Sequence, residues 1–542
     1  MTSNAATFPV EWRDPADAGF TWFRDAMHFP APVTPLTAAF LLECLEPGVA
    51  AACATLASPL RTLRHSSFRG WIYNSPVPAG APEEMEAIVA AHMPVMGDHM
   101  DNLRRRWDTE YLPALLRLTD EIDALDFTGD DASASAALER LVAINREIWQ
   151  IHFQIVFPKL AAGERLSGIY TEVTGTTDEM EPYRCLQGIP NKSIETDRAL
   201  WELAQQARDV PGVADALAAG TPAEALEALD RDPGGRAWKE RFQDFLDEYG
   251  RRAQAMDLSA PTWQEEPSFA VENLRRYLAA DAADPEGQRE RLRAEADALV
   301  AAARARIADP GMQAAFDGIL EAARQAWPLE EDHAFYIDQR SLAGATRLAC
   351  LRIGARLVGE GRLGALEDVW FCTFEDLRDA LAGRDLTERA REARRRYAED
   401  SLLDAPPFIG VPPDPSAPVD PGLVKFFGRP GPPEVEDAVL RGSAGSRGRV
   451  EGVARVVRSL QELHRVQPGE ILVCRSTTPP WTPIFASIAG LVTDTGGVLA
   501  HGAIVAREYA IPAVMGTKIG TQIIRDGQRI TVDGDAGEVL IA

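Results

Sequence analysis

One histidine, His501, stands where a predicted strand, a glycine-rich turn and a predicted helix follow one another. The strand is predicted at Gly490–Thr493, the turn holds Gly496 and Gly497, and the helix begins near His501 and continues through Arg507. An imidazole at the first turn of a helix lies beside unpaired backbone N–H groups and the positive end of the helix dipole. A phosphate dianion is stabilised there. The arrangement therefore predicts that His501 acts as a nucleophile that carries a phosphoryl group.

Small and polar residues near this histidine are the candidate phosphate ligands. Glycine at 502 leaves room beside the imidazole ring, and the two turn glycines allow a close backbone approach. A second predicted strand, Glu470–Cys474, ends in three polar residues that either contact the phosphate or form a turn. The predicted phosphate-binding residues are Gly496, Gly497, Gly502, Arg475, Ser476 and Thr477.

The pattern around His501 resembles that of a known family. Within Thr493–Val514, the string GG-x-x-x-H-x-AIVARE-x-x-IPAV is similar to the phosphohistidine swivelling domain of phosphoenolpyruvate-utilising enzymes, among them dikinases, rifampicin phosphotransferase and phenylphosphate synthase. The likeness covers Gly442–Ala542 and implies that His501 is the phosphorylated residue. Dikinases and synthases usually carry Thr-Ser before the histidine, whereas Leu499 and Ala500 stand here, so control through that threonine is not expected.

The preceding residues resemble, more loosely, the acceptor domain of rifampicin phosphotransferase and the phenylphosphate-synthase group. The likeness lies in His28–Leu36, Leu186–Ser193, Phe245–Ser268, Glu331–Leu363 and Leu366–Leu377. The glutamate that rifampicin enzymes usually carry after the Tyr-Gly-x-Arg segment is missing here, which weakens rifampicin itself as the substrate. No P-loop and no ATP-grasp region is recognisable. The resemblance thus implies an acceptor subunit that binds no cofactor tightly itself, with ATP and Mg²⁺ bound at a separate ATP-grasp subunit.

The distribution of helix-forming, proline-rich and strand-forming segments along the chain agrees with this division. Residues rich in Ala, Leu, Arg and Glu with apolar spacing of three to four predict helices at Glu195–Ala207, Pro222–Leu229, Trp238–Arg252, Pro285–Ala308, Ser341–Val358 and His99–Leu125. Prolines favour an extended, semi-rigid connector from about Ala405. Short strands follow, at Arg449–Val457 and Arg529–Val532 among others. The predicted fold is multidomain: a mostly α acceptor domain (1–404), a connector (405–440) and a C-terminal swivelling α/β (β/β/α) phosphohistidine domain (441–542).

Phosphoryl transfer to a hydroxyl needs a base for the O–H proton and cations for the phosphate oxygens. In the acceptor domain, His333 beside Asp332 is the candidate base. Arg340 and Arg347, seven residues apart on one predicted helix, are candidates to hold the phosphate, and Asp338 completes the set. Each of these residues has a structural alternative, as a helix-start residue or as a member of an ion pair.

The composition limits the classes of partner. The 542 residues include 56 Lys and Arg against 82 Asp and Glu, a formal charge of -26 at pH 7. So negative a surface repels nucleic acids and anionic membranes, and neither is an expected partner. The six cysteines form no CxxC pair and no Cys/His cluster has metal-site spacing, so no metal ligands are predicted. Without a recognisable signal peptide or a long apolar stretch, we expect a cytoplasmic protein.

Together these features predict one component of a two-component phosphotransferase. His501 would accept a phosphoryl group that originates from ATP and pass it to a hydroxyl of a small organic compound, for which a phenolic or aromatic acceptor is the expectation by analogy. Two alternatives remain open: a phosphate-activated condensing enzyme similar to the prodigiosin-forming ligases, and a non-catalytic phosphocarrier or regulatory module.

Overall fold

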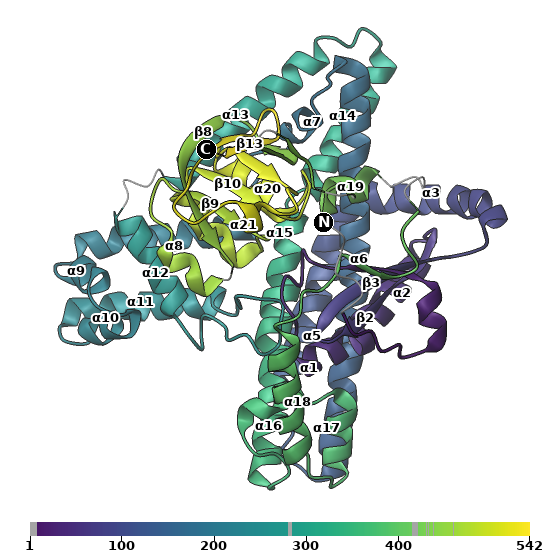
Figure 1. The fold of residues 1–542 in the computed structure, drawn as a ribbon. Helices are drawn as coiled ribbons and strands as arrows, with labels where there is room; N and C mark the ends of the chain where they lie inside the picture. The colour runs from purple at the N-terminus through teal and green to yellow at the C-terminus, as the bar shows by residue number, and fades with distance from the viewer. Residues whose placement is uncertain are drawn as a thin grey trace. The chain divides into compact units, whose positions relative to one another are not determined.

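The computed structural model of the chain describes residues 8–279, 284–414, 421–429, 431, 433–436, 438–458 and 460–541 (Figure 1). Contacts between residues divide the chain into two units. Unit 1 consists of Met1–Pro158, Ala255–Pro261 and Tyr336–Pro418, and unit 2 of Lys159–Gln254, Thr262–Phe335 and Val419–Ala542. The helix α6 (Asp131–Thr174) contributes residues to both units. His501 belongs to unit 2, which therefore holds the candidate site.

Unit 1 is mostly helical, with one small sheet. Its helical elements are α1 (Pro35–Phe40), η2 (Leu41–Leu45), α2 (Glu46–Thr55), α3 (Met85–Asp101), α4 (Leu103–Arg106), η4 (Trp107–Tyr111), α5 (Leu112–Ala124), α16 (Arg347–Gly359), η6 (Leu366–Phe371), α17 (Phe374–Leu381) and α18 (Thr387–Asp400), with the short η1 (Pro15–Gly19) and η3 (Pro82–Glu84). The element η5 (Phe335–Thr346) also belongs to unit 1, except for Phe335, which ends the segment Thr262–Phe335 of unit 2. The single helix predicted at His99–Leu125 is instead interrupted at Asn102, which leaves the helical region at φ -111° and ψ 9°. After it, α4, the π-helical η4 and α5 follow one another without a break. The helix predicted at Ser341–Val358 begins as the π-helical η5.

The sheet of unit 1 was not predicted. Strands β1 (Thr21–Arg24), β2 (Leu60–Phe68), β3 (Trp71–Pro78) and β4 (Phe408–Gly410) pair antiparallel in the order β2-β3-β1-β4. These segments hold few Val or Ile residues. Buried aromatic side chains support them instead: the ring centroids of Trp22 and Phe68 lie 6.0 Å apart, and those of Phe68 and Tyr73 lie 5.7 Å apart.

Within the described residues, only the stretch Pro35–Thr55 is helical, long and apolar enough to cross a membrane. Most of its apolar window is buried inside unit 1. Phe40 packs edge-on against Trp149, with 6.2 Å between ring centroids, and a Cβ added to Gly48 would lie 2.7 Å from the Trp149 Cβ. The stretch packs as a core element of unit 1.

The first part of unit 2 consists of helices. They are α7 (Glu181–Arg184), α8 (Lys192–Asp209), α9 (Val213–Ala218), α10 (Pro222–Leu229), α11 (Pro233–Tyr249), α12 (Ser268–Ala279), α13 (Pro285–Arg304), α14 (Pro310–Ala326) and α15 (Leu329–Ala334). Of these, α8, α10, α11 and α13 overlap predicted helices, and the others were not predicted. A buried apolar cluster that includes Leu166, Tyr183, Leu320 and Ile504 joins α6, α7, α14 and the C-terminal region of unit 2.

The C-terminal part of unit 2 is an α/β arrangement around one nine-stranded sheet (Figure 1, yellow and green). The strands are β5 (Val435–Glu436), β6 (Val439–Arg441), β7 (Ser443–Ser446), β8 (Arg449–Val457), β9 (Ile471–Cys474), β10 (Gly490–Thr493), β11 (Ala513–Met515), β12 (Arg529–Asp533) and β13 (Glu538–Ile541), in the order β5-β6-β13-β12-β8-β9-β10-β11-β7. The helical elements are η7 (Leu460–Arg465), η8 (Pro479–Ala486), α20 (His501–Glu508) and α21 (Gly520–Ile523). Strands β8 to β11 run parallel, so the loops after β9 and β10 leave the same edge of the sheet.

The proline-rich connector is only partly extended in its described residues. It holds the strand β4 and the short helix α19 (Pro421–Phe427), whereas positions 415–420, 430, 432 and 437 lie outside the described residues. The expectation of an extended chain is therefore wrong at α19. Pro421 stands at the first helical position, where a backbone N–H has no partner within the helix, so its absence in proline costs no hydrogen bond. No other proline lies within the helix.

Candidate functional site

The element that presents His501 is α20, whose first residue is His501 itself. Ala500 precedes it in an extended conformation, φ -69° and ψ 153°, and no described side chain caps the helix. The chain reaches this point from β10 through a turn in which Gly496 adopts φ +90°, a conformation that favours glycine. The prediction of a strand, a glycine turn and a helix that begins at His501 is thus confirmed.

A buried carboxylate holds one side of the imidazole. His501 Nδ1 lies 3.2 Å from Glu331 Oε1, and the two side chains are only 11% and 4% exposed. Glu331 is on α15, and its second oxygen accepts a hydrogen bond of 2.5 Å from Ser193 Oγ at the start of α8. In contrast, His501 Nε2 is buried and has no hydrogen-bond partner among the described residues. One ring nitrogen is thus fixed and the other is available.

The charge of Glu331 determines which ring nitrogen carries the proton. Burial raises the pKa of Glu331, but His501, the hydrogen bond from Ser193 and the nearby Arg252 outweigh burial and bring the pKa to about 2. An ionised carboxylate can only accept hydrogen bonds, so Nδ1 of His501 carries the hydrogen. The lone pair of Nε2 is then free to act as a nucleophile.

Sequence reasoning missed Glu331 as a site residue. It selected the stretch that contains Glu331 and took His333, two residues later, as the chemically active group. Glu331 and His501 are 170 positions apart, and no local pattern connects them. The signal available in the sequence was only that two carboxylates, Glu330 and Glu331, stand side by side in that stretch.

Two of the predicted phosphate-binding residues lie against each other at the first turn of α20. The Oγ1 atom of Thr477, in the loop after β9, is buried and has no hydrogen-bond partner among the described residues. A Cβ added to Gly502 would lie 2.5 Å from that oxygen. Ser476 is also buried there, and the carbonyl oxygen of Arg475 accepts hydrogen bonds of 3.0 Å from both the backbone N and the Oγ1 of Thr495. The loops after β9 and β10 are therefore joined beside His501.

Gly497 approaches the connector helix α19. Its backbone N donates a 2.9 Å hydrogen bond to the carbonyl oxygen of Phe426, and Leu499 N donates one of 2.7 Å to that of Lys425. A Cβ added to Gly497 would lie 2.3 Å from the Lys425 carbonyl oxygen. Close packing against α19 thus explains why this position is glycine, and its contact with phosphate stays a prediction.

The helix α19 is also tied to the helical part of unit 2. Lys425 Nζ forms a 2.8 Å ion pair with Glu164 on α6 and lies 3.2 Å from the hydroxyl of Tyr183 on α7. Tyr183 in turn donates a 2.6 Å hydrogen bond to Glu164. The segment just before the sheet therefore contacts both the His501 loop and the helices.

The four residues predicted for the acceptor site are divided between the two units. His333 lies in unit 2, where burial lowers its pKa and Nδ1 lies 2.5 Å from the Leu329 carbonyl oxygen. Asp338, Arg340 and Arg347 lie in unit 1. Arg347 Nη1 donates a 2.5 Å hydrogen bond to the carbonyl oxygen of Leu258, and its guanidinium lies 4.7 Å from the centre of the Trp370 ring.

The partner predicted for His333 has another role. The carboxylate of Asp332 accepts a 2.8 Å hydrogen bond from the backbone N of Lys192. His333 is instead influenced by Glu330, which pairs with the buried Lys159 at 2.9 Å. These contacts are those of a structural cluster, so the structural alternative for His333 gains support.

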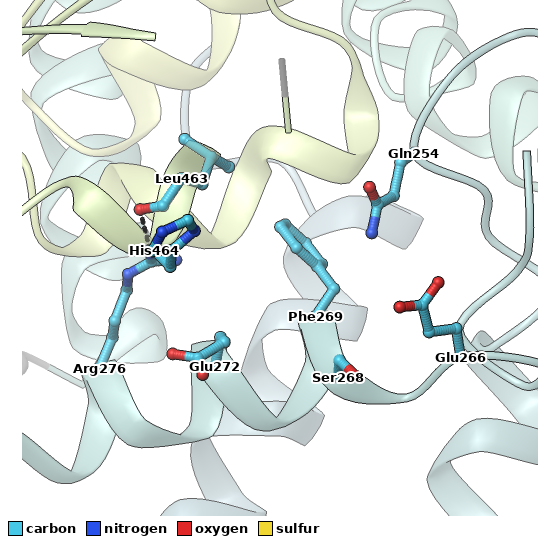
Figure 2. A pocket seen from close by; sticks show the side chains of 8 residues that line it. All are labelled: Gln254, Glu266, Ser268, Phe269, Glu272, Arg276, Leu463 and His464. Carbon is cyan, nitrogen blue, oxygen red and sulfur yellow. Dashed lines mark hydrogen bonds between the residues drawn. The ribbon is translucent and has the colours of Figure 1, made fainter. Parts of the chain in front are cut away.

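The described part of the chain contains no group of three or more His, Cys, Asp or Glu residues that could hold a metal ion. A cavity of about 240 Å³ lies in unit 2 between α12 and η7 (Figure 2). Its lining includes Glu266, Glu272 and Arg276, and Arg276 Nη2 donates a 2.5 Å hydrogen bond to the Leu463 carbonyl oxygen. No residue predicted from the sequence lines this cavity.

Two family models match the chain. Residues 466–537 match the mobile domain of PEP-utilising enzymes, and residues 152–331 match the fourth domain of rifampicin phosphotransferase. His501 lies within the first match, and Glu331 is the last residue of the second. The hydrogen bond at the site thus joins two regions with separate family relationships.

Several curated proteins are similar over most of the chain. A chondramide synthase of Chondromyces crocatus is 32% identical over 98% of this chain and 14% of its own length. An uncharacterised phosphotransferase, YvkC of Bacillus subtilis, is 30% identical over 96% of this chain and 62% of its own. A rifampicin phosphotransferase of Streptomyces sviceus is 32% identical over 65% of this chain and 40% of its own. The chain thus spans less than two thirds of each of these relatives.

Proposed function

Because this chain belongs to the PEP-utilising family and carries a rifampicin-phosphotransferase-like domain, we propose that it is a phosphotransferase whose covalent carrier is His501. The phosphoryl group originates from ATP and passes from His501 to a hydroxyl of a small organic compound. The observation that carries this proposal is the difference between the two nitrogens of the His501 imidazole. Nδ1 is hydrogen-bonded to Glu331, whereas Nε2 is buried without a hydrogen-bond partner among the described residues.

The proposal includes a division of labour. The helical region that matches the rifampicin phosphotransferase domain binds the acceptor hydroxyl, which we propose belongs to a phenolic or aromatic compound. An ATP-grasp subunit in the cytoplasm binds ATP and Mg²⁺ and supplies the phosphoryl group.

The residues around His501 suit both halves of the reaction. The Nε2 lone pair accepts the phosphoryl group, while Glu331 keeps the ring oriented through Nδ1. The proposed donors to the phosphoryl oxygens are the first backbone N–H groups of α20 and the hydroxyl of Thr477, which is buried without a partner among the described residues.

The decisive experiment is intact-protein mass spectrometry after incubation with ATP, Mg²⁺ and a purified ATP-grasp partner. We expect the wild type to gain one acid-labile phosphoryl group and His501→Ala to gain none. His464→Ala, which removes an exposed histidine of the same unit, is the matched control and should label like the wild type. Labelling of His501→Ala would overturn the carrier role. Labelling of the wild type without the partner would overturn the separate ATP-grasp subunit.

Gly502→Ala is expected to slow the labelling of His501 about tenfold or more, because small displacements of a reacting group have effects of that size. The added methyl would lie 2.5 Å from Thr477 Oγ1 and 3.0 Å from Met515 Cε, so the first turn of α20 must shift. Single-turnover labelling, followed by mass, measures the rate. The double variant Gly502→Ala/Thr477→Ala relieves the closest contact but also removes the hydroxyl proposed to bind the phosphate, so Thr477→Ala alone is its reference. In the Thr477→Ala background the added methyl should slow labelling much less than it does in the wild type. An equal slowing in both backgrounds would contradict this steric account.

A further inference from the structure

The hydrogen bond between His501 and Glu331 joins a residue of the mobile-domain match to a residue of the match to the rifampicin phosphotransferase domain. A group that travels on His501 would meet Glu331 only when the two regions are together. We propose that Glu331 is a positioning residue that activates the phosphorylated histidine at the acceptor domain: it keeps Nδ1 protonated, so that the ring leaves phosphorus as neutral imidazole. This inference rests on the proposed function.

The geometry assigns the phosphoryl group to Nε2. Nδ1 is occupied by Glu331 at 3.2 Å, and the other carboxylate oxygen is fixed by Ser193 Oγ at 2.5 Å. Both oxygens of Glu331 therefore have defined partners, and its side chain is only 4% exposed. A carboxylate held by two contacts cannot rotate away without breaking both, so the position of the Nδ1 proton is fixed.

The chemistry of the transfer depends on that proton. The acceptor oxygen forms a bond to phosphorus, the P–Nε2 bond breaks, and its electron pair returns to Nε2. The proton of the acceptor hydroxyl passes to water. With Nδ1 still protonated, the leaving group is neutral imidazole, whereas without that proton it would be the far more basic imidazolate. A negative carboxylate at Nδ1 favours the protonated ring, because opposite charges in a buried site stabilise each other.

The surroundings keep Glu331 ionised. Burial acts against the charge, but the contacts with His501 and Ser193 and the charge of Arg252 lower the pKa of Glu331 to about 2. Three further titratable groups, Glu330, His333 and Glu508, interact electrostatically with Glu331. A second layer of charged groups acts through these residues or through Arg252: Asp197 on Arg252, and Arg507 and Arg289 on Glu508. Burial raises the pKa of Glu508 to about 7, so it changes charge near neutrality and must be controlled for.

The test uses phosphoramidate, a small donor that phosphorylates histidine without an ATP-grasp partner, so it is independent of the proposed ATP route. Phosphorus NMR identifies the labelled nitrogen and follows the loss of the group to water between pH 6 and 9. Signals that persist in His501→Ala are subtracted. The wild type should carry phosphate on Nε2 and lose it at a rate that changes little with pH.

Glu331→Gln keeps a hydrogen-bond acceptor at Nδ1 but removes the charge. We expect its rate of phosphate loss to fall as the pH rises and to be about tenfold below the wild type at pH 8, the effect of one unit in the pKa of the ring. Glu321→Gln, an exposed position on α14, is the control and should match the wild type, and Glu508→Gln excludes a contribution from that group. Equal pH profiles for the wild type and Glu331→Gln would overturn the proposal.

A second measurement uses only the wild-type protein, so it tests the proposal even if Glu331→Gln does not fold. Nitrogen NMR of the unphosphorylated wild type, labelled with ¹⁵N in histidine, reports the tautomer of His501 directly. The proposal requires a proton on Nδ1 and none on Nε2 at pH 8. The opposite tautomer, or phosphate on Nδ1 in the first experiment, would overturn it. Failure of ATP-dependent labelling alone would count against the proposed function and leave this result unchanged.

Discussion

Arg252→Met is expected to lower the free energy of unfolding by about 3–5 kcal/mol, the usual effect of removing one partner from a buried set of charges. The Arg252 side chain is 1% exposed and lies 5.1 Å from the centre of the Trp263 ring. Its charge stabilises two buried carboxylates, Glu331 and Asp197. Methionine fills a similar volume but leaves both carboxylates without that cation. Urea unfolding followed by tryptophan fluorescence measures the change.

The pH dependence of the free energy of unfolding distinguishes the contribution of Asp197 from that of Glu331. Burial raises the pKa of Asp197 from 3.8 to about 7, although Tyr277 and Arg252 act in the opposite direction. The folded protein therefore holds this proton between about pH 4 and 7, and by itself Asp197 makes folding less favourable as the pH rises through that range. The loss in Arg252→Met should thus be larger at pH 8, where Asp197 is charged, than at pH 5. Adding Asp197→Asn should remove this difference. A pH-independent loss would contradict the pairing of Arg252 with Asp197.

Gly497→Ala is expected to lower the free energy of unfolding by about 1–3 kcal/mol, as overpacking does, and to release α19 from the His501 loop. The new Cβ would lie 2.3 Å from the Lys425 carbonyl oxygen and 2.7 Å from that of Val424, and backbone atoms cannot rotate away. Two backbone hydrogen bonds, from Gly497 and Leu499, would be lost with the contact. Hydrogen exchange of the α19 amides should become about tenfold faster or more, since local opening sets that rate.

The matched control for this variant is Gly168→Ala. Gly168 is an exposed residue of α6 in the same unit, and nothing lies within 4 Å of a Cβ added there. Alanine at this position should raise the free energy of unfolding by about 0.5–1 kcal/mol, because it favours the helix. Exchange in α19 should not change. If both variants behave alike, the contact between Gly497 and α19 does not matter for stability.

The parts of this structure that could be predicted are those with local causes. The helix α10 matches its predicted bounds because Thr221 and Glu224 form a capping box and Pro222 opens the helix. The strand β8 matches because its Val residues alternate between two faces. His501 was found for the same reason, since the strand, the turn and the helix around it are continuous in sequence.

The parts that could not be predicted depend on contacts between distant residues. Nothing near Glu331 shows that its carboxylate faces His501, and nothing near Phe408–Gly410 shows that this segment pairs with β1. The strand β2 combines Arg, His and Ser with few β-branched residues, so its extended form comes from its partner strand and from buried aromatic rings. The acceptor residues were chosen by their type and local spacing, and the fold places them in two units.

The helix α19 has a consequence for how far the C-terminal region can travel. Its seven residues span about 10 Å as a helix, at 1.5 Å per residue. The same residues span about 23 Å when fully extended. In a protein that moves His501 between a donor and an acceptor, as proposed, α19 acts as a reserve of chain length. Unwinding it lengthens the tether by about 13 Å, at the moment when Lys425 and Phe426 lose their contacts with Glu164, Gly497 and Leu499. The region that carries His501 would then leave the acceptor region and gain a longer tether in one step.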